Sequence, residues 1–210
     1  MNAIEIAIGV AAVVAIAGVL VWAYLRARRW RDMVVAVAER YRIKCLAPTG
    51  VMAMGTATAF GPIREIDIDL KIDEETRGTG DRSTTTRFLN LSASGDFDER
   101  LRLHDRKRKS PQEEAGLMDF GDTGEAAETP IGDPAFDARL LVRGASPGLV
   151  TALASGDLRK RVMDLAEWGL VVEGGNITLR TRRFPSTKEQ MFELVDGVVT
   201  LAQDLAARQR

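Results

Sequence analysis

The chain has 210 residues and is almost neutral, with 29 basic and 30 acidic side chains but one cysteine and one histidine. A single cysteine excludes an internal disulfide framework and a cysteine-rich metal site, and a single histidine excludes zinc sites that need two imidazoles. The balanced charge gives no reason to expect a nucleic-acid partner.

One apolar run, from Ile6 to Leu25, dominates the N-terminal part of the chain. At about 1.5 Å per residue a helix of this length is roughly 30 Å long, which matches the hydrocarbon core of a bilayer. No lysine or arginine precedes the run, whereas a cleaved signal peptide has a positive segment before a shorter apolar core. The run therefore predicts a retained transmembrane helix over residues 6–25, after a short extracytoplasmic N-terminus over residues 1–5.

Four arginines follow this run directly: Arg26, Arg28, Arg29 and Arg31. The positive-inside bias then predicts that the C-terminal side lies in the cytoplasm. Close to the membrane surface, the same arginines are candidates for contact with anionic lipid. The small residues Ala7, Ala11 and Ala15 would allow a second helix to pack closely in a homo-oligomer, although alanine is also a common filler of membrane helices.

From Trp30 to Tyr41 the apolar residues recur at helical spacing, so the helix is expected to continue or restart there. Its apolar stripe could lie on lipid, pair with a second copy or dock on the following domain, and docking is the expected arrangement. The stretch from Cys45 to Gly50 is typical of a linker. Residues 26–50 are thus assigned to a basic juxtamembrane helix and linker, and residues 51–210 to one cytoplasmic domain.

After the linker the apolar period changes from 3.6 to 2. Strands are predicted for residues 51–60, 66–72, 84–93, 101–104 and 136–142, the first four in an antiparallel meander. Residues 109–131 combine proline, glycine and acidic side chains with little periodicity, which predicts a mobile acidic loop.

The C-terminal third predicts helices and one hairpin. Ser146-Pro147 begins a helix to about Ser155, Asp157 caps a second one to about Trp168, strands 170–173 and 177–183 form a hairpin, and a capping box at Ser186–Glu189 begins a closing helix. The whole pattern predicts an α+β domain, a mostly antiparallel sheet with helices packed on one face. A curled sheet with a C-terminal helix, as in pleckstrin-homology domains, is the alternative.

Two side-chain pairs are candidates for chemistry. Asp67 and Asp69 lie two apart on a predicted strand and could hold Mg²⁺ or Mn²⁺ through oxygen ligands, but strand alternation already explains polar residues there. His104 and Asp105 are adjacent on a strand, so they point to opposite faces and do not form a base with its orienting partner. We therefore predict no catalytic residues and no cofactor, and keep Asp67 and Asp69 as weak metal candidates.

The longest basic run is Arg106, Lys107, Arg108 and Lys109. On a domain tethered to the inner leaflet such side chains could contact anionic lipid. The alternative is an edge strand whose charges deter edge-to-edge pairing.

A resemblance follows from Gly132–Asp137, Leu141–Gly144, Leu158-Arg159 and the hairpin end Gly175–Ile177. These stretches are similar to uncharacterised bacterial proteins with a single membrane helix. The resemblance implies a bacterial inner-membrane setting and supplies no site residues.

Together these features predict a membrane-anchored binding or scaffolding domain, in contact with the lipid bilayer and with a protein partner that the sequence does not identify. A metal-assisted hydrolase using Asp67 and Asp69, and a domain that senses anionic lipid, are the alternatives.

The predicted orientation makes the single thiol a reporter. Cys45 follows the arginine cluster and should be protected from a membrane-impermeant maleimide in intact cells. Labelling of Cys45 from outside would overturn the orientation.

Overall fold

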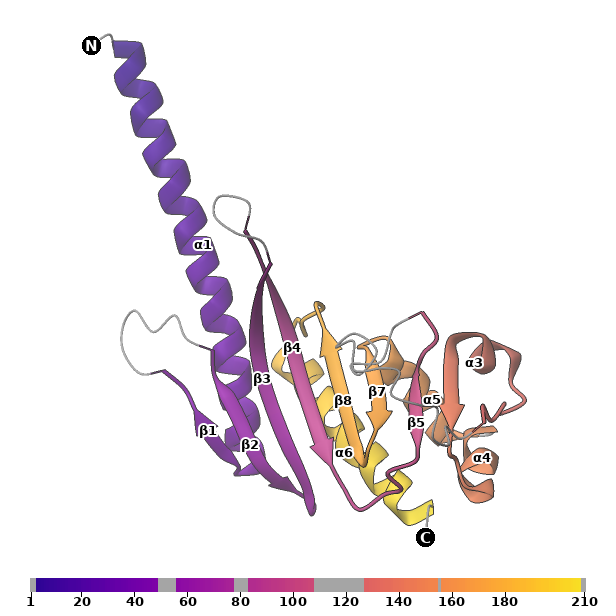
Figure 1. Ribbon diagram of the computed structural model, residues 1–210. Coiled ribbons are helices and arrows are strands. Elements are labelled where there is room, and N and C mark those ends of the chain that lie inside the picture. Colours follow the sequence, from indigo (N-terminus) through magenta and orange to yellow (C-terminus); the bar gives the residue numbers. More distant parts are fainter. Residues whose placement is uncertain (1–2, 49–55, 78–82, 108–126, 155, 209–210) are drawn as a thin grey trace.

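The fold is α+β, a long N-terminal helix followed by an eight-stranded antiparallel sheet that carries helices on one face (Figure 1). The computed structural model describes residues 3–48, 56–77, 83–107, 127–154 and 156–208. Its helices are α1 (Ala3–Tyr41), α3 (Pro134–Arg139), α4 (Pro147–Ala154), α5 (Asp157–Ala166) and α6 (Lys188–Arg208). Its strands are β1 (Lys44–Leu46), β2 (Thr58–Ile63), β3 (Ile66–Arg77), β4 (Thr84–Ser94), β5 (Arg102–Asp105), β6 (Leu140–Arg143), β7 (Leu170–Glu173) and β8 (Asn176–Thr181).

The sheet has the strand order β1-β2-β3-β4-β8-β7-β5-β6. The meander prediction is therefore right from β2 to β4 and wrong for β5, because the β7–β8 hairpin lies between β4 and β5. β8 pairs with β4 over six residues and aligns Ile177 and Leu179 with Ala93 and Leu91, all four of them buried. Apolar alternation predicts that β5 is a strand but does not say which strand lies beside it. Since β1 and β6 remain as two edges, the sheet is open and the pleckstrin-homology-like alternative is wrong.

Two local predictions fail at places where side chains or backbone turn the chain. The predicted strand over residues 136–142 begins as helix α3, because the Asp133 side chain accepts the Phe136 N–H at 2.8 Å and Pro134 suits the first turn. The predicted linker begins with strand β1, because Arg42 adopts a positive φ of 55° and the chain turns back from α1 to pair with β2. The acidic loop over residues 109–131 lies outside the described residues up to residue 126.

The capping box of α6 lies one residue later than predicted, with Thr187 and Gln190 in place of Ser186 and Glu189. Thr187 Oγ1 accepts the Gln190 N–H at 3.2 Å, and Gln190 Oε1 accepts the Ser186 N–H at 2.8 Å. The two bonds satisfy orphan donors at the start of α6 reciprocally, with glutamine in the role expected for Glu189.

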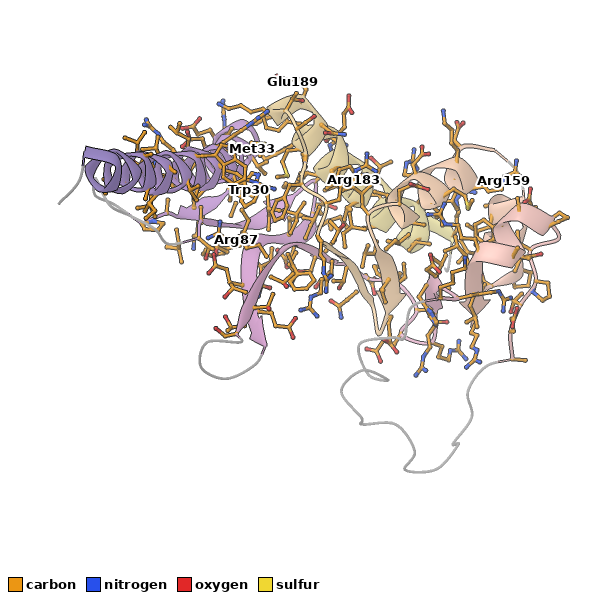
Figure 2. The ribbon with its side chains drawn as sticks, turned by 90° about the horizontal axis from the view of Figure 1, so that it is seen from above. Trp30, Met33, Arg87, Arg159, Arg183 and Glu189 are labelled. Carbon is orange, nitrogen blue, oxygen red and sulfur yellow. The ribbon has the colours of Figure 1, made fainter. Side chains whose placement is uncertain are left out.

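The helices lie along one face of the sheet, where α1 covers β2, α6 covers β3 and β4, and α5 covers β7 (Figure 2). The other face is polar. On it Arg102 of β5 pairs with Glu173 of the neighbouring β7 at 3.6 Å, and Arg180 of β8 reaches across β4 to Glu75 of β3 at 3.2 Å. This is the arrangement expected of an antiparallel sheet with one wet face.

Helix α1 has two environments. Among the described residues it is the one helix long and apolar enough to cross a membrane, and side chains of its upper half, such as Val13 and Leu20, are more than 60% exposed. In its lower half, Met33, Val34 and Val37 are at most 2% exposed. The expectation that the apolar stripe docks on the domain is confirmed.

This contrast predicts opposite effects for two similar truncations. Met33→Ala removes buried contacts and should lower the free energy of unfolding by about 2–5 kcal/mol, whereas Leu20→Ala on the same helix should change it by less than about 0.5 kcal/mol. Pulse proteolysis in urea on the full chain in mild detergent measures both. Equal effects would show that the lower half of α1 is not part of the core.

Candidate functional site

The junction between α1 and the domain is formed by the segment that joins β8 to α6. Phe184 stacks on Trp30 with ring centroids 4.1 Å apart and an interplanar angle of 13°. The Arg29 guanidinium donates a hydrogen bond to the Ser186 carbonyl oxygen. A segment more than 150 residues away in sequence is thereby fixed against the base of the apolar run.

A hollow of about 470 Å³ opens at this junction. Its walls carry three arginines and three aromatic rings: Trp22, Arg26, Arg29, Trp30, Arg182 and Phe184. The volume is within the range of small-molecule sites, which is roughly 300–1,000 Å³. No carboxylate among the described residues lines it, so its charge is positive.

The residues that α1 contributes share one helical face. Trp22, Arg26, Arg29 and Trp30 are spaced at i, i+4, i+7 and i+8, which brings them to the same side. The Arg26 guanidinium carbon lies 5.2 Å from the Trp22 ring centroid and 4.8 Å from that of Trp30. These two cation–π contacts keep the charge of Arg26 between the two rings at the hollow.

The strand side contributes Arg182, whose guanidinium carbon lies 5.4 Å from the Phe88 ring centroid. Its neighbour Arg180 also lies over Phe88, at 4.5 Å, but pairs with Glu75. Within the described part of the chain no ion pair joins Arg26, Arg29 or Arg182 to a carboxylate.

The structure therefore divides the four juxtamembrane arginines into two pairs. Arg26 and Arg29 line the hollow, whereas Arg28 and Arg31 lie 3.9 Å and 3.7 Å from Asp32. The sequence indicated all four as lipid contacts without separating them.

The second basic run lies elsewhere. Arg106 follows β5, pairs with Glu128 and donates from Nε to the Asp137 carbonyl at 2.7 Å. Lys107 is exposed, and Arg108 and Lys109 lie outside the described residues. Figure 1 shows the end of β5 on the side of the domain toward which α1 projects.

Asp67 and Asp69 lie on the polar face of β3, opposite Ser94 and Ser92 of β4. Among the described residues no group of three or more histidine, cysteine or acidic side chains is arranged to hold a metal ion. One oxygen of Asp69 is buried without a hydrogen-bond partner in the described part of the chain. The two aspartates remain a pair without a third ligand there.

His104 does not meet the carboxylate of its neighbour. Its Nδ1 lies 3.2 Å from the backbone oxygen of Asp105, and the Asp105 carboxylate accepts the Lys107 N–H at 2.8 Å. The pair has the geometry that strand alternation predicts.

Another hollow, of about 430 Å³, lies between α5 and α6. Leu165, Trp168 and Leu194 form its apolar part, and acidic and basic side chains such as Asp164 and Lys160 line its rim. Because charges of both signs line it, it does not select a ligand by charge.

Little in the sequence indicated which residues the domain would contribute to the junction. From the sequence, Arg182 is predicted only as an outward-facing residue of a strand. Phe184 lies in the connection between that strand and the closing helix. An aromatic residue before a proline in such a connection was the available signal, and it does not identify the helix on which the ring stacks.

The chain matches no protein-family model, no curated protein and no solved structure. These comparisons neither support nor contradict the similarity to bacterial proteins with one membrane helix.

The lower end of the α1–α6 interface contains a perturbed tyrosine. Burial, together with the neighbouring Asp196 carboxylate, raises the pKa of Tyr41 to about 12. Tyr41 packs edge-on against Phe192 with centroids 6.4 Å apart, and Arg40 and Arg64 lie 3.8 Å and 3.3 Å from Asp196.

This pKa predicts an alkaline weakening of the fold. Because the folded state holds the Tyr41 proton more tightly than the unfolded state, the stabilisation is complete below pH 10 and is lost as the pH rises from 10 towards 12. Urea midpoints of the wild type should fall more steeply over that interval than those of Tyr41→Phe. Parallel pH profiles for the two proteins would show that Tyr41 ionises equally in both states.

Proposed function

We propose that the chain is a single-pass membrane protein, with its N-terminus outside, whose α+β domain is a binding domain held rigidly against the cytoplasmic surface of the inner membrane. One observation carries the proposal: α1 runs without a break from an apolar, exposed segment into the core of the domain. A domain joined to its anchor in this way has a fixed height and orientation relative to the bilayer.

The contacts along α1 support rigid attachment. Met33, Val34 and Val37 lie in the same apolar core as residues of α6 and the sheet, and the Trp30–Phe184 stack and the Arg29 hydrogen bond fix the upper end of the interface. A flexible tether would instead be rich in glycine and serine and make few contacts.

The chemistry of the junction supports binding. Guanidinium groups attract anions and the aromatic rings offer faces for stacking, so the hollow is suited to hold an anion or a ring. The four arginines after the apolar run support the cytoplasmic orientation through the positive-inside bias.

Rigid attachment predicts a narrow distance distribution between anchor and domain. Spin labels at Val13→Cys and Lys188→Cys, in a Cys45→Ser background and in lipid nanodiscs, should give one narrow peak by double electron–electron resonance. The same pair with Gly-Ser-Gly-Ser inserted between Leu25 and Arg26 supplies the broad reference. A wild-type distribution as broad as that reference would refute the proposal.

Two introduced cysteines report the orientation of the chain in the membrane better than the native Cys45 does. Burial and the nearby Glu39 raise the pKa of Cys45, which slows its reaction with maleimide on either side of the membrane. Leu46 is 65% exposed. In the Cys45→Ser background an impermeant maleimide should label Asn2→Cys and spare Leu46→Cys until detergent is added, and the reverse pattern would refute the orientation.

A further inference from the structure

We propose that the hollow between α1 and the β8–α6 segment binds the phosphate of an acidic phospholipid headgroup, through Arg26 and Arg29. The inference rests on the proposed function, because it requires the apolar run to span a bilayer. It adds a ligand class and a defined site to that function.

The depth of the hollow fits a headgroup. The apolar run ends at Leu25, and the residues from Arg26 to Trp30 cover about 6 Å of helix axis beyond it. The headgroup layer on each side of a bilayer is roughly 5–7 Å thick. The hollow therefore lies beside the phosphates of the leaflet on the domain side.

The charges of the hollow are available to a ligand. Arg28 and Arg31 are close to Asp32. In the described part of the chain Arg26 instead has the Trp22 and Trp30 rings as neighbours, and Arg29 donates to the Ser186 carbonyl oxygen. Guanidinium groups donate several hydrogen bonds in a fixed plane that matches phosphate oxygens. Two of them in one hollow would give a net attraction for an anionic headgroup over a zwitterionic one.

The aromatic residues suit the same ligand. Trp22 is 60% exposed in the upper part of α1, while Trp30 is buried against Phe184. Tryptophan side chains favour the boundary between hydrocarbon and headgroups. Trp22 would therefore contact the start of an acyl chain whose phosphate lies among the arginines.

The test compares two double variants with the same loss of charge at the same depth. Arg26→Gln with Arg29→Gln changes the hollow, whereas Arg28→Gln with Arg31→Gln changes the other side of α1. The full chain in mild detergent is titrated with short-chain phosphatidylglycerol, short-chain phosphatidylcholine or glycerol 3-phosphate, and the shift in melting temperature gives an apparent affinity.

We expect phosphatidylglycerol to raise the melting temperature of the wild type and of the Arg28/Arg31 variant equally. The Arg26/Arg29 variant should bind it at least about tenfold more weakly, because it loses charge-assisted hydrogen bonds to the phosphate. Phosphatidylcholine should have a much smaller effect on all three proteins.

Three results would overturn the proposal. Equal weakening in both double variants would mean that only the general charge of α1 attracts lipid. Equal shifts with phosphatidylcholine would remove the role of headgroup charge, and saturation by glycerol 3-phosphate at the same concentration would mean that the ligand is a soluble phosphoester. The spin-label distances and the maleimide pattern stay unchanged in each case, so the proposed function can stand when the lipid site fails.

Discussion

The burial of the lower half of α1 is the constraint on which the rest of the structure depends. Met33, Val34 and Val37 complete a core that is otherwise built mainly from one face of the sheet and from α3, α4, α5 and α6. Without this helix, β2 and part of α6 would expose apolar surface to water. The helix is therefore a structural element of the domain as well as the candidate anchor, and the two roles meet at Trp30.

This double role explains why the polar features of the junction lie where they do. Docking of α1 places the β8–α6 segment beside the turn of α1 that contains Trp30. The stacked Trp30 and Phe184 rings form the floor of the hollow. The arginines around that floor belong to two parts of the chain, and packing of the apolar residues brings them together. A change in core packing would therefore alter the hollow even if no arginine were touched.

The fold class could be predicted from the sequence because local patterns were strong. Alternation gave β3 and β4, and the Gly174-Gly175 turn, with both φ angles positive, gave the β7–β8 hairpin. Such local patterns do not predict the order of the strands, because the pairing of β8 with β4 depends on contacts between residues far apart in sequence. The α3 error was a competition between apolar alternation and a local cap, in which the Asp133 cap prevailed. For the site, charge density indicated Arg26 and Arg29, but Arg182 and Phe184 join them only through tertiary packing.

The long separation between Arg29 and Ser186 has a consequence for biosynthesis. These positions are 157 residues apart, and at about 5–20 residues per second a ribosome needs roughly 8–30 s to travel between them. During that interval the apolar stripe of α1 has been synthesised, but α6, which covers it, has not. Nascent chains that stop before α6 would keep this apolar surface exposed and would become substrates of quality-control proteases.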